Sequence, residues 1–375
     1  MNRWEERRLG DLIEINPETM SVSKYKGYIN YIDIGAVNKG NLEGYVSYDI
    51  TEAPSRARRI VRDDDIIFSS VRPNLRAYYY MKDSPQNAVC STGFTVLRAS
   101  IGLIDSKFLY YLVTENSFVD YLSLVATGSA YPAVDTTDFK KAKVTVPLLS
   151  VQKRIGDILS KYDDLIENNN KRIKILEQMA ENLYKEWFVR FRFPGYEDAE
   201  FENGLPKGWE YLRLDKVVTV FYGKDHSKLE LGDIPVYGSG GLMRYGNRAL
   251  YEGESVLIPR KGSLNNIMWV NHSFWTVDTM FYTKALIPHI EKYIFYVLSS
   301  LDMASFNTGA ALPSMTTDIL YHLKIMVPSI TVLSKFDNIV SKLYEQRVLL
   351  ENVNQNLIKQ RDRLLPRLMS GKLEV

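Results

Sequence analysis

The sequence has only one cysteine, Cys90, which excludes an internal disulfide and a zinc site built on several cysteines. No apolar run reaches the ~18 residues that a membrane-spanning helix needs. The first eight residues, MNRWEERR, are too polar for a signal peptide, and these features together predict a cytoplasmic protein. An excess of one charge is also missing, because 47 Lys and Arg face 45 Asp and Glu. A nucleic-acid surface would therefore have to come from local clusters of basic residues.

Familiar catalytic signatures are absent as well. The sequence has no Gly-x-x-x-x-Gly-Lys-Ser/Thr phosphate loop, no Gly-x-Ser-x-Gly elbow and no Asn/Asp-Pro-Pro-Tyr/Phe motif of amino-methyltransferases. Residues 237–241 are rich in glycine but lack a lysine, so a turn is favoured over a nucleotide site. Cys90 has no evident histidine partner and is expected to be a buried structural thiol. No metal-ligand spacing connects the four histidines, which are His226, His272, His289 and His322.

The chain contains an internal repeat. Residues 127–132, TGSAYP, return as residues 308–313, TGAALP, at an offset of 181. Over residues 127–161 this offset gives 12 identities in 35 positions, where unrelated sequences would give roughly two. Residues 4–9 match residues 209–214 at an offset of 205, so the stretch between the two landmarks is 24 residues longer in the first copy. The two copies therefore share their ends and differ in their middles.

Each copy begins with a mixed part and ends in a long helix. Short apolar runs that end at turn signals predict strands at 28–35, 66–71, 234–238 and 255–259. Apolar residues at helical spacing predict helices at 108–121 and 290–300. This order of elements, repeated twice, is typical of an α+β fold.

The second part of each copy carries a heptad seam. The first helix is predicted at about residues 148–190, starting near Ser150, and its only strongly polar seam residue, Asn169, can fix the register. The second helix starts near Thr331 and ends at Pro366 or at residues 370–371. The predicted seam residues are Ile155, Leu159, Ile166, Asn169, Ile173, Leu176 and Leu183 in the first helix, and Leu343, Leu350, Leu357 and Leu364 in the second.

The second seam is less complete than the first. It has Arg347, Asn354 and Arg361 where the first helix has Ile166, Ile173 and Ala180. This substitution leaves part of the second helix available to a partner protein.

A long helix must bury its apolar stripe, and the other long helix of the same chain is the simplest partner. The predicted fold is therefore α+β, with two domains separated by two long antiparallel coiled-coil helices and a pseudo-twofold internal repeat. The predicted parts are residues 1–147, 148–192, 193–328 and 329–375. The seam is core in any case, and the functional interpretation adds that the helix pair is a rigid spacer of roughly 60 Å.

Basic clusters occur in both domains. For each cluster alone a solvated face is the simpler interpretation, but two of them, at 70–74 and 259–263, follow a strand at similar places in the two copies. Arg pairs with guanine and Asn with adenine, whereas Lys and other Arg neutralise phosphates. We hypothesise that Arg72 and Arg260 each lie near DNA. The full set of DNA-binding candidates is Arg56, Arg58, Arg59, Arg72, Asn74 and Arg76 in the first domain, and Arg244, Arg248, Arg260, Lys261, Ser263 and Asn265 in the second.

Two small polar pairs, at 127–128 and 308–309, lie on a loop before the final strand of each domain. They are consistent with a simple turn. They are equally consistent with close approach of the backbone to a phosphate or to the helix pair.

Several segments resemble type I restriction-modification specificity subunits. LPKGWE at 205–210 is similar to the start of a target-recognition domain in that family. Residues 152–169 and 183–188 are similar to its central helix, and residues 364–373 to its closing segment. The segments come in the family's order and span the whole chain.

The resemblance implies a specificity subunit without catalytic activity. Each target-recognition domain would read one half of a bipartite double-stranded DNA site. The helices would set the spacer and dock two modification (methyltransferase) subunits, which restriction (translocase and nuclease) subunits join. S-adenosylmethionine, ATP and magnesium are expected only on those partners, and we expect no cofactor or metal on this chain and no membrane contact.

Two other functions stay open. The chain could be a scaffold in which two domains on a coiled-coil rod bind other proteins, and salt-dependent DNA binding would separate this class from the main one. It could also be a fragment of a larger methylase-nuclease, which a neighbouring adenine methyltransferase gene would disfavour.

Overall fold

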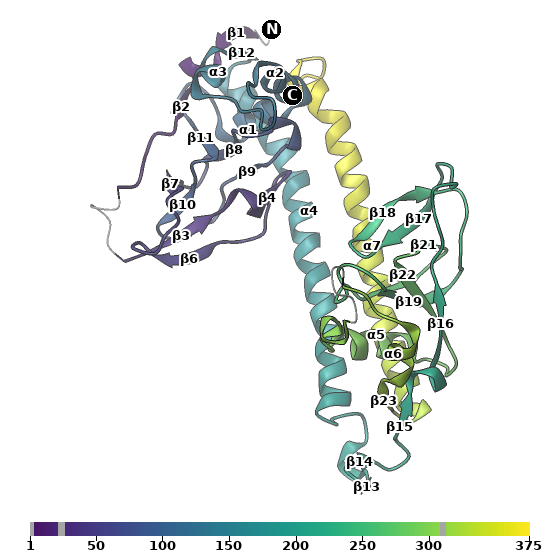
Figure 1. Ribbon diagram of the computed structural model, residues 1–375. Helices are drawn as coiled ribbons and strands as arrows, with labels where there is room; N and C mark the ends of the chain where they lie inside the picture. Colours follow the sequence, from purple (N-terminus) through teal and green to yellow (C-terminus); the bar gives the residue numbers. More distant parts are fainter. Residues whose placement is uncertain (1–3, 22–26, 308–312) are drawn as a thin grey trace. The chain divides into compact units, whose positions relative to one another are not determined.

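The computed structural model describes residues 4–21, 27–307 and 313–375. They form two compact units, which are unit 1, Met1–Asn169 with Asn352–Val375, and unit 2, Asn170–Glu351 (Figure 1). Both long helices contribute residues to each unit. No helix in the described parts of the chain is long and apolar enough to cross a membrane. The division at residues 147, 192 and 328 stays a prediction.

In its described residues, unit 1 is built on two four-stranded sheets and two two-stranded ribbons. Its strands are β1 (Glu5–Arg8), β2 (Ile13–Ile15), β3 (Tyr28–Ile32), β4 (Val37–Asn38), β5 (Asn41–Leu42), β6 (Val46–Asp49), β7 (Ala57–Ile60), β8 (Ile66–Ser69), β9 (Tyr78–Tyr80), β10 (Ala88–Ser91), β11 (Phe94–Ala99) and β12 (Lys143–Val146). One sheet has the order β2-β11-β8-β9, and the other has the order β6-β3-β10-β7 with β3 and β10 parallel. One ribbon pairs β4 with β5, and the other pairs β1 with β12.

Strand β8 shows how the alternating pattern of a strand separates two cores. Successive side chains of a strand point to opposite faces. Ile66 and Phe68 belong to the core beneath the helices, whereas Ile67 belongs to the core between the sheets. All four residues of β8 are buried, as expected of a central strand. Cys90 lies in the second of these cores, so the predicted buried thiol is confirmed, and burial raises its pKa.

Three short helices complete the first domain, α1 (Ser106–Thr114), α2 (Asn116–Val125) and α3 (Thr136–Lys141). The prediction of one helix over 108–121 is wrong, because Glu115 is extended (ψ 148°) and separates α1 from α2. Apolar spacing continues across the break, since both helices bury one face in the same core. The carboxylate of Asp105 caps α1 by accepting from the amide of Phe108 (3.0 Å).

Unit 2 repeats this plan. Its strands are β13 (Phe201–Glu202), β14 (Leu205–Pro206), β15 (Glu210–Arg213), β16 (Val218–Tyr222), β17 (Ile234–Gly238), β18 (Gly241–Gly246), β19 (Glu254–Pro259), β20 (Met268–Asn271), β21 (Trp275–Thr276), β22 (Met280–Ala285) and β23 (Lys324–Val327), and its short helices are α5 (Glu291–Ser299) and α6 (Thr317–His322). The sheet β16-β22-β19-β20 corresponds to β2-β11-β8-β9, and the ribbon β15-β23 corresponds to β1-β12. Even the parallel pair recurs, as β17 beside β21.

The two copies differ between corresponding strands. In unit 1 residues 33–45, with β4 and β5, connect β3 to β6. In unit 2 a turn of two residues, Ser239 and Gly240, connects β17 to β18. The prediction of a turn at 237–241 is thus confirmed, and the variable middles of the repeat are connections on a constant frame.

The long helices are α4 (Leu149–Tyr184), which continues into a π-helical turn at Lys185–Val189, and α7 (Ile330–Met369). Both begin within one residue of the predicted starts. Of the two predicted ends of α7, Pro366 is wrong, because the helix passes it and ends before Gly371, whose φ is +70°.

The helices pair antiparallel through polar contacts. In unit 1, Asn169 donates from Nδ2 to Oδ1 of Asn354 (2.8 Å), and both side chains are buried. Arg361 pairs with Asp163. In unit 2, Arg347 pairs with Glu177 (3.3 Å). The second seam's polar residues thus face α4, which corrects the expectation that they are left for a partner protein.

None of the predicted seam residues is fully exposed. Those that are buried are Ile155, Leu159, Asn169 and Leu350, and those that are half-buried are Ile166, Ile173, Leu176, Leu183, Leu343, Leu357 and Leu364. At the end of α4 in unit 2, Phe188 packs on Phe336 of α7, with ring centroids 4.9 Å apart. The burial of these positions agrees with the predicted seam, and their role in docking a subunit stays a prediction.

Candidate nucleic-acid interface

The turn after β8 in unit 1 holds the first predicted arginine, Arg72. Its backbone amide donates to the carbonyl of Pro132 (2.7 Å), and the amide of Val134 donates to the carbonyl of Ser70 (2.9 Å). Val71 forms a β-bridge with Ala133. The repeated segment that ends in Pro132 is thus tied to the turn.

The turn after β19 in unit 2 has the same frame. The amide of Gly262 donates to the carbonyl of Pro313 (3.1 Å), and the amide of Met315 donates to the carbonyl of Arg260 (2.9 Å). Since the repeat carries Pro132 onto Pro313, these bonds align the two turns residue by residue. Arg72 corresponds to Gly262, so the two predicted arginines lie in equivalent turns but two positions apart.

Arg72 lies over an exposed aromatic ring. Its guanidinium carbon is 4.5 Å from the centroid of Tyr131, and its Nη2 donates to the carbonyl of Ala130 (3.2 Å). Tyr131 is 68% exposed. Arg72 itself has a left-handed backbone, with φ 51°.

Arg260 also lies over a tyrosine. Its guanidinium carbon is 5.4 Å from the centroid of Tyr222, and its Nη1 donates to the carbonyl of Asp278 (3.1 Å). Tyr222 is half exposed, and its hydroxyl contacts the hydroxyl of Thr317 (3.2 Å). Each domain therefore presents an arginine stacked on an exposed tyrosine at the same turn.

Other candidates in unit 1 are held within the domain to different degrees. Asn74 and Arg56 are exposed, whereas Arg58 donates to the carbonyl of Ala57 (2.8 Å). Arg59 has a buried Nε without a hydrogen-bond partner in the described residues. Arg76 donates to Oδ1 of Asn116 on α2 (2.7 Å).

Two candidates in unit 2 serve the architecture of the domain. Arg244 donates from Nη1 to the carbonyl of Leu229 (3.2 Å) and from Nη2 to the carbonyl of His226, which anchors the loop between β16 and β17. Asn265 donates to Asp302 (3.1 Å) and accepts from the amide of Ala304 (2.9 Å).

The remaining candidates of unit 2 lie at its surface. Arg248 is exposed and lies over the ring of Trp275, 5.3 Å from the centroid. Ser263 is exposed and Lys261 is half-buried. The predicted pair Thr308 and Gly309 lies outside the described residues, whereas Thr127 forms a β-bridge with Ala133.

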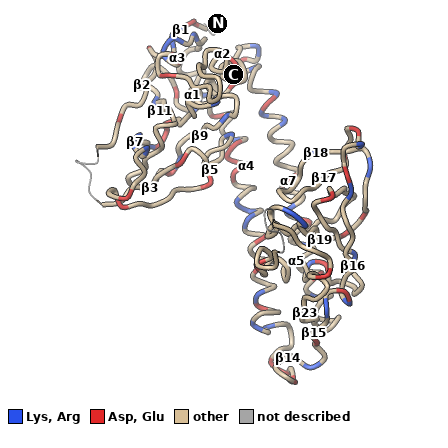
Figure 2. Tube along the Cα trace, viewed as in Figure 1, with Lys and Arg blue, Asp and Glu red and all other residues tan. Residues whose placement is uncertain are grey.

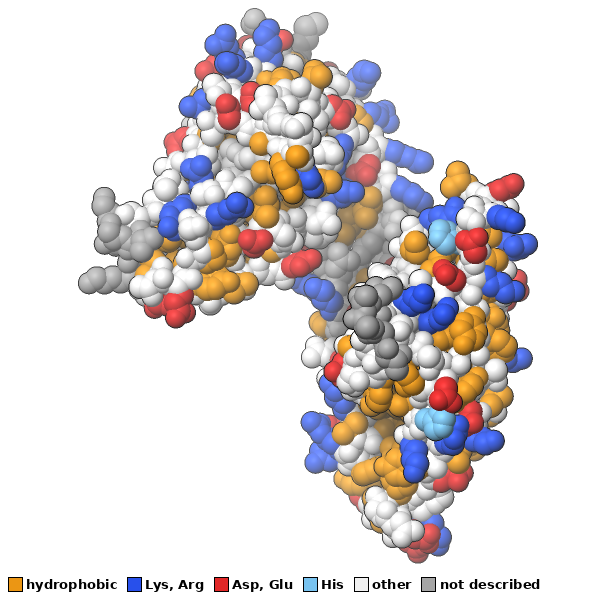
Figure 3. Space-filling view, viewed as in Figure 1, with side chains coloured by type: hydrophobic (Ala, Val, Ile, Leu, Met, Phe, Trp, Pro, Cys, Tyr) orange, Lys and Arg blue, Asp and Glu red, His pale blue; other side chains and the backbone are white. Residues whose placement is uncertain are grey.

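Basic residues are mixed with acidic residues in the parts of both units that the structure describes (Figure 2). Lys and Arg alternate with Asp and Glu along each unit (Figure 2), and the face drawn in Figure 3 shows basic, acidic and hydrophobic side chains interspersed.

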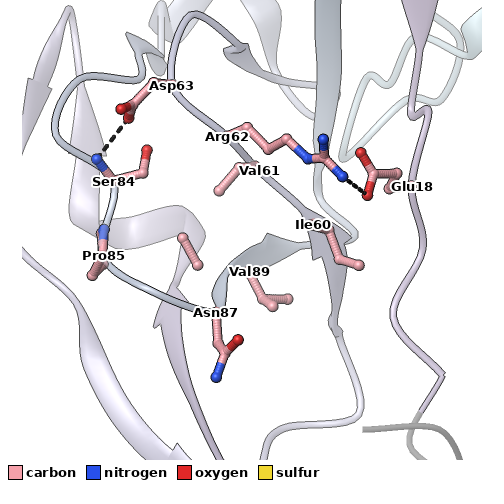
Figure 4. A pocket seen from close by; sticks show the side chains of 10 residues that line it. Glu18, Ile60, Val61, Arg62, Asp63, Ser84, Pro85, Asn87 and Val89 are labelled. Atoms are coloured by element: carbon pink, nitrogen blue, oxygen red, sulfur yellow. Dashed lines mark hydrogen bonds and ion pairs between the residues drawn. The ribbon is translucent and has the colours of Figure 1, made fainter.

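A cavity of about 330 Å³ in unit 1 lies between β7 and the loop that precedes β10 (Figure 4). Its acidic residues are already engaged, because Glu18 pairs with Arg62 (2.6 Å) and Asp63 accepts from the amide of Ser84 (2.7 Å). The hydrogen bond from Arg98 holds the pKa of Glu18 below its ordinary value. Arg62 also lines the cavity, so the cavity's charged side chains are of both signs and already have partners within unit 1.

No three His, Cys, Asp or Glu side chains of the described residues gather in a way that could hold a metal ion. Sequence reasoning missed the two stacked tyrosines. Tyr131 stands inside the repeated TGSAYP segment, which was a usable signal. Tyr222 carries no such signal, because it lies at the end of an ordinary strand.

Comparisons with known proteins agree on one family. A family model described as type I restriction modification DNA specificity domain matches residues 1–178 and 206–360. The chain is 25% identical over 413 residues to the type I restriction enzyme MjaIX specificity subunit of Methanocaldococcus jannaschii, with 99% of this chain and 94% of that protein covered. It is 20% identical over 463 residues to the type I restriction enzyme HindI specificity subunit of Haemophilus influenzae, with both chains covered in full. Its fold is similar to the crystal structure of the type I restriction-modification S subunit from M. genitalium, with a TM-score of 0.62 at 17% identity over 98% of this chain and 96% of that one.

Proposed function

Because the chain belongs to the family of type I restriction-modification DNA specificity domains, we propose that it reads a bipartite DNA site on behalf of partner enzymes. Each domain reads one half of the site. The helix pair sets the length of the spacer between the half-sites, whose sequence is not read, and it docks two modification subunits. Restriction subunits then join this complex.

The proposal rests on one observation. The strands correspond between the two domains, whereas the loops that connect them differ in length. The ribbons have the same register in both domains, with Glu5 opposite Val146 and Glu210 opposite Val327. The connection after β3 is long and contains a hairpin, whereas the one after β17 has two residues. One frame with different loops allows two different half-sequences to be read in the same way.

The two arginine–tyrosine stacks are the best candidates for DNA contact. Arg72 and Arg260 follow equivalent strands, and their aromatic partners are exposed. Arginine is the commonest reader of guanine in the major groove. Arg244 and Asn265 are weaker candidates, because their polar groups already bind their own domain.

The helix pair supports the docking role. In unit 2, Ile175 and Met179 of α4 and Leu349 of α7 are each more than half exposed. Each lies two residues from the Glu177–Arg347 pair, and therefore about 160° around its helix from that pair. Each helix therefore carries exposed apolar residues on its side away from the salt bridge, and we place the modification subunits there.

The chain positions other proteins and does no chemistry itself. We assign S-adenosylmethionine to the modification subunits, and ATP and magnesium to the restriction subunits. The 36 residues of α4 extend roughly 54 Å at 1.5 Å per residue. A rod of this length is suited to a spacer, because half-sites read from one DNA face lie about 34–36 Å apart per helical turn.

Binding to mixed-sequence duplex DNA tests the proposal. The chain with its modification subunit should bind at ~50 mM salt and lose affinity steeply as salt is added, because phosphate contacts release counterions. A scaffold for protein partners predicts no such binding. Undetectable binding at low salt with the modification subunit present would remove the recognition role.

A further inference from the structure

The turns after β8 and β19 require a left-handed residue at one position. In unit 2 that residue is Gly262, with φ +85°, and in unit 1 it is Arg72, with φ 51°. The bonds to Pro313 and Pro132 make the two positions equivalent. Glycine adopts this conformation without steric cost, whereas an arginine strains its backbone there. Arg72 therefore holds a backbone conformation that its counterpart Gly262 adopts without steric cost.

Two contacts hold the side chain of Arg72 at the surface. The ring of Tyr131 supports one face of the guanidinium at 4.5 Å, and the carbonyl of Ala130 accepts from Nη2. Within the described residues, the ring of Tyr131 and the carbonyl of Ala130 are the contacts of the Arg72 guanidinium. The guanidinium has five N–H donors in a rigid fork, so donors remain for a ligand.

Unit 2 reaches the same arrangement from different positions. Arg260 lies two places earlier in its turn than Arg72, and its ring partner Tyr222 comes from β16 and not from the repeated segment. The stack therefore recurs although its residues are not equivalent. If the arginine–tyrosine contact only stabilised the fold and had been inherited with the repeat, equivalent residues would form it in both copies.

We propose that Arg72 is a specificity-determining residue that reads a guanine in the half-site of the first domain, and that Tyr131 is its positioning residue. A planar fork fits the O6 and N7 acceptors of guanine. The same fork also fits two phosphate oxygens, so the sequence preference of the variants separates the two contacts. The inference rests on the proposed function, because it takes DNA as the ligand.

The test uses the chain in complex with its modification subunit, expressed in a host without adenine methylation. Sequencing of methylated adenines gives the recognised site for the unaltered chain and for each variant. Arg72→Gly should leave the urea midpoint of the chain equal or higher, since glycine relieves the strain. It should also raise methylation about tenfold at sites with another base at one guanine position of one half-site.

Matched variants separate the possible roles. Arg72→Lys keeps the charge but lacks the fork, so it should relax the same position as Arg72→Gly. Tyr131→Phe keeps the ring and should retain the site, whereas Tyr131→Ala should relax it. The other half-site, read in the same molecules, is the internal control and should not change.

Three results would overturn the inference. An unchanged site in Arg72→Gly would exclude base reading. A lower urea midpoint for Arg72→Gly would show that the arginine–tyrosine contact stabilises the fold. Uniformly weaker methylation with unchanged sequence preference, together with normal behaviour of Arg72→Lys, would show a phosphate contact. Failure of the proposed function is distinguishable, because the unaltered chain would then give no methylated site.

Discussion

The buried pair of Asn169 and Asn354 predicts opposite effects for single and double substitutions. Asn169→Leu removes the donor to Oδ1 of Asn354, which is 2.8 Å away in a site where both residues are less than a tenth exposed. Removing one partner of a buried hydrogen bond costs about 1–3 kcal/mol, and the added leucine offsets part of this by burial. We expect a net loss of about 1 kcal/mol in the free energy of unfolding.

Asn169→Leu with Asn354→Leu should behave differently. Replacing both partners of a hydrogen bond with apolar groups is nearly neutral or stabilising, because neither side chain is left with an unmet polar atom from that bond. The two substitutions should therefore couple by about 2 kcal/mol, and the double variant should be at least as stable as the unaltered chain. It should also lose the register that a polar seam pair specifies, and so tolerate more than one spacer length in methylated sites.

Urea titration of the four chains, followed by circular dichroism, measures the coupling. Asn168→Leu is the matched control, because Asn168 is exposed on the same helix and its replacement should have little effect. A double variant that is less stable than either single variant would contradict the reasoning. It would show that the pair stabilises the helices beyond what two leucines provide.

Three further predictions address the helix pair and the two domains. Deleting four to seven residues from α4 should shorten the tolerated spacer or abolish assembly with the modification subunit, and an unaltered spacer in sequenced methylation sites would exclude the spacer role. The hydrogen bond from Arg98 lowers the pKa of Glu18 in the folded chain. The ionised Glu18 therefore adds to the free energy of unfolding above the ordinary carboxyl pKa, and this stability is lost as the pH falls through the lowered pKa. Urea midpoints between pH 3 and 6 should therefore fall less steeply for Glu18→Gln than for the unaltered chain, and parallel curves would refute this. Lys292 is 3% exposed and pairs with Glu254 and Asp337 (both 2.7 Å), so Lys292→Met should cost about 3–5 kcal/mol by leaving two carboxylates without their cation, and a loss below about 1 kcal/mol by urea titration would refute it.

The internal repeat predicted the corresponding strands, and the heptad pattern predicted the two long helices. Both could be predicted because each pattern is formed by residues close together in the sequence. Corresponding residues of the repeat, such as Lys143 and Lys324, open corresponding strands β12 and β23. Strands β3, β8, β17 and β19 lie where short apolar runs end at turn signals. The break at Glu115 was not predictable from spacing, because α1 and α2 bury their apolar faces in one core.

The candidate site was less predictable, because it depends on contacts between distant segments. Arg72 and Arg260 look equivalent in sequence, and only the bonds to Pro132 and Pro313 show that Gly262 is the true counterpart of Arg72. Composition could not separate Arg248, at the surface, from Arg244, whose guanidinium binds its own domain.

The methylated sites of the unaltered complex provide the most direct measurement. Single-molecule sequencing of DNA methylated by the chain with its modification subunit should give one bipartite site, with two short specified segments that flank a spacer of fixed length. A continuous site, or a site in which only one segment is specified, would contradict the assignment of one half-site to each domain.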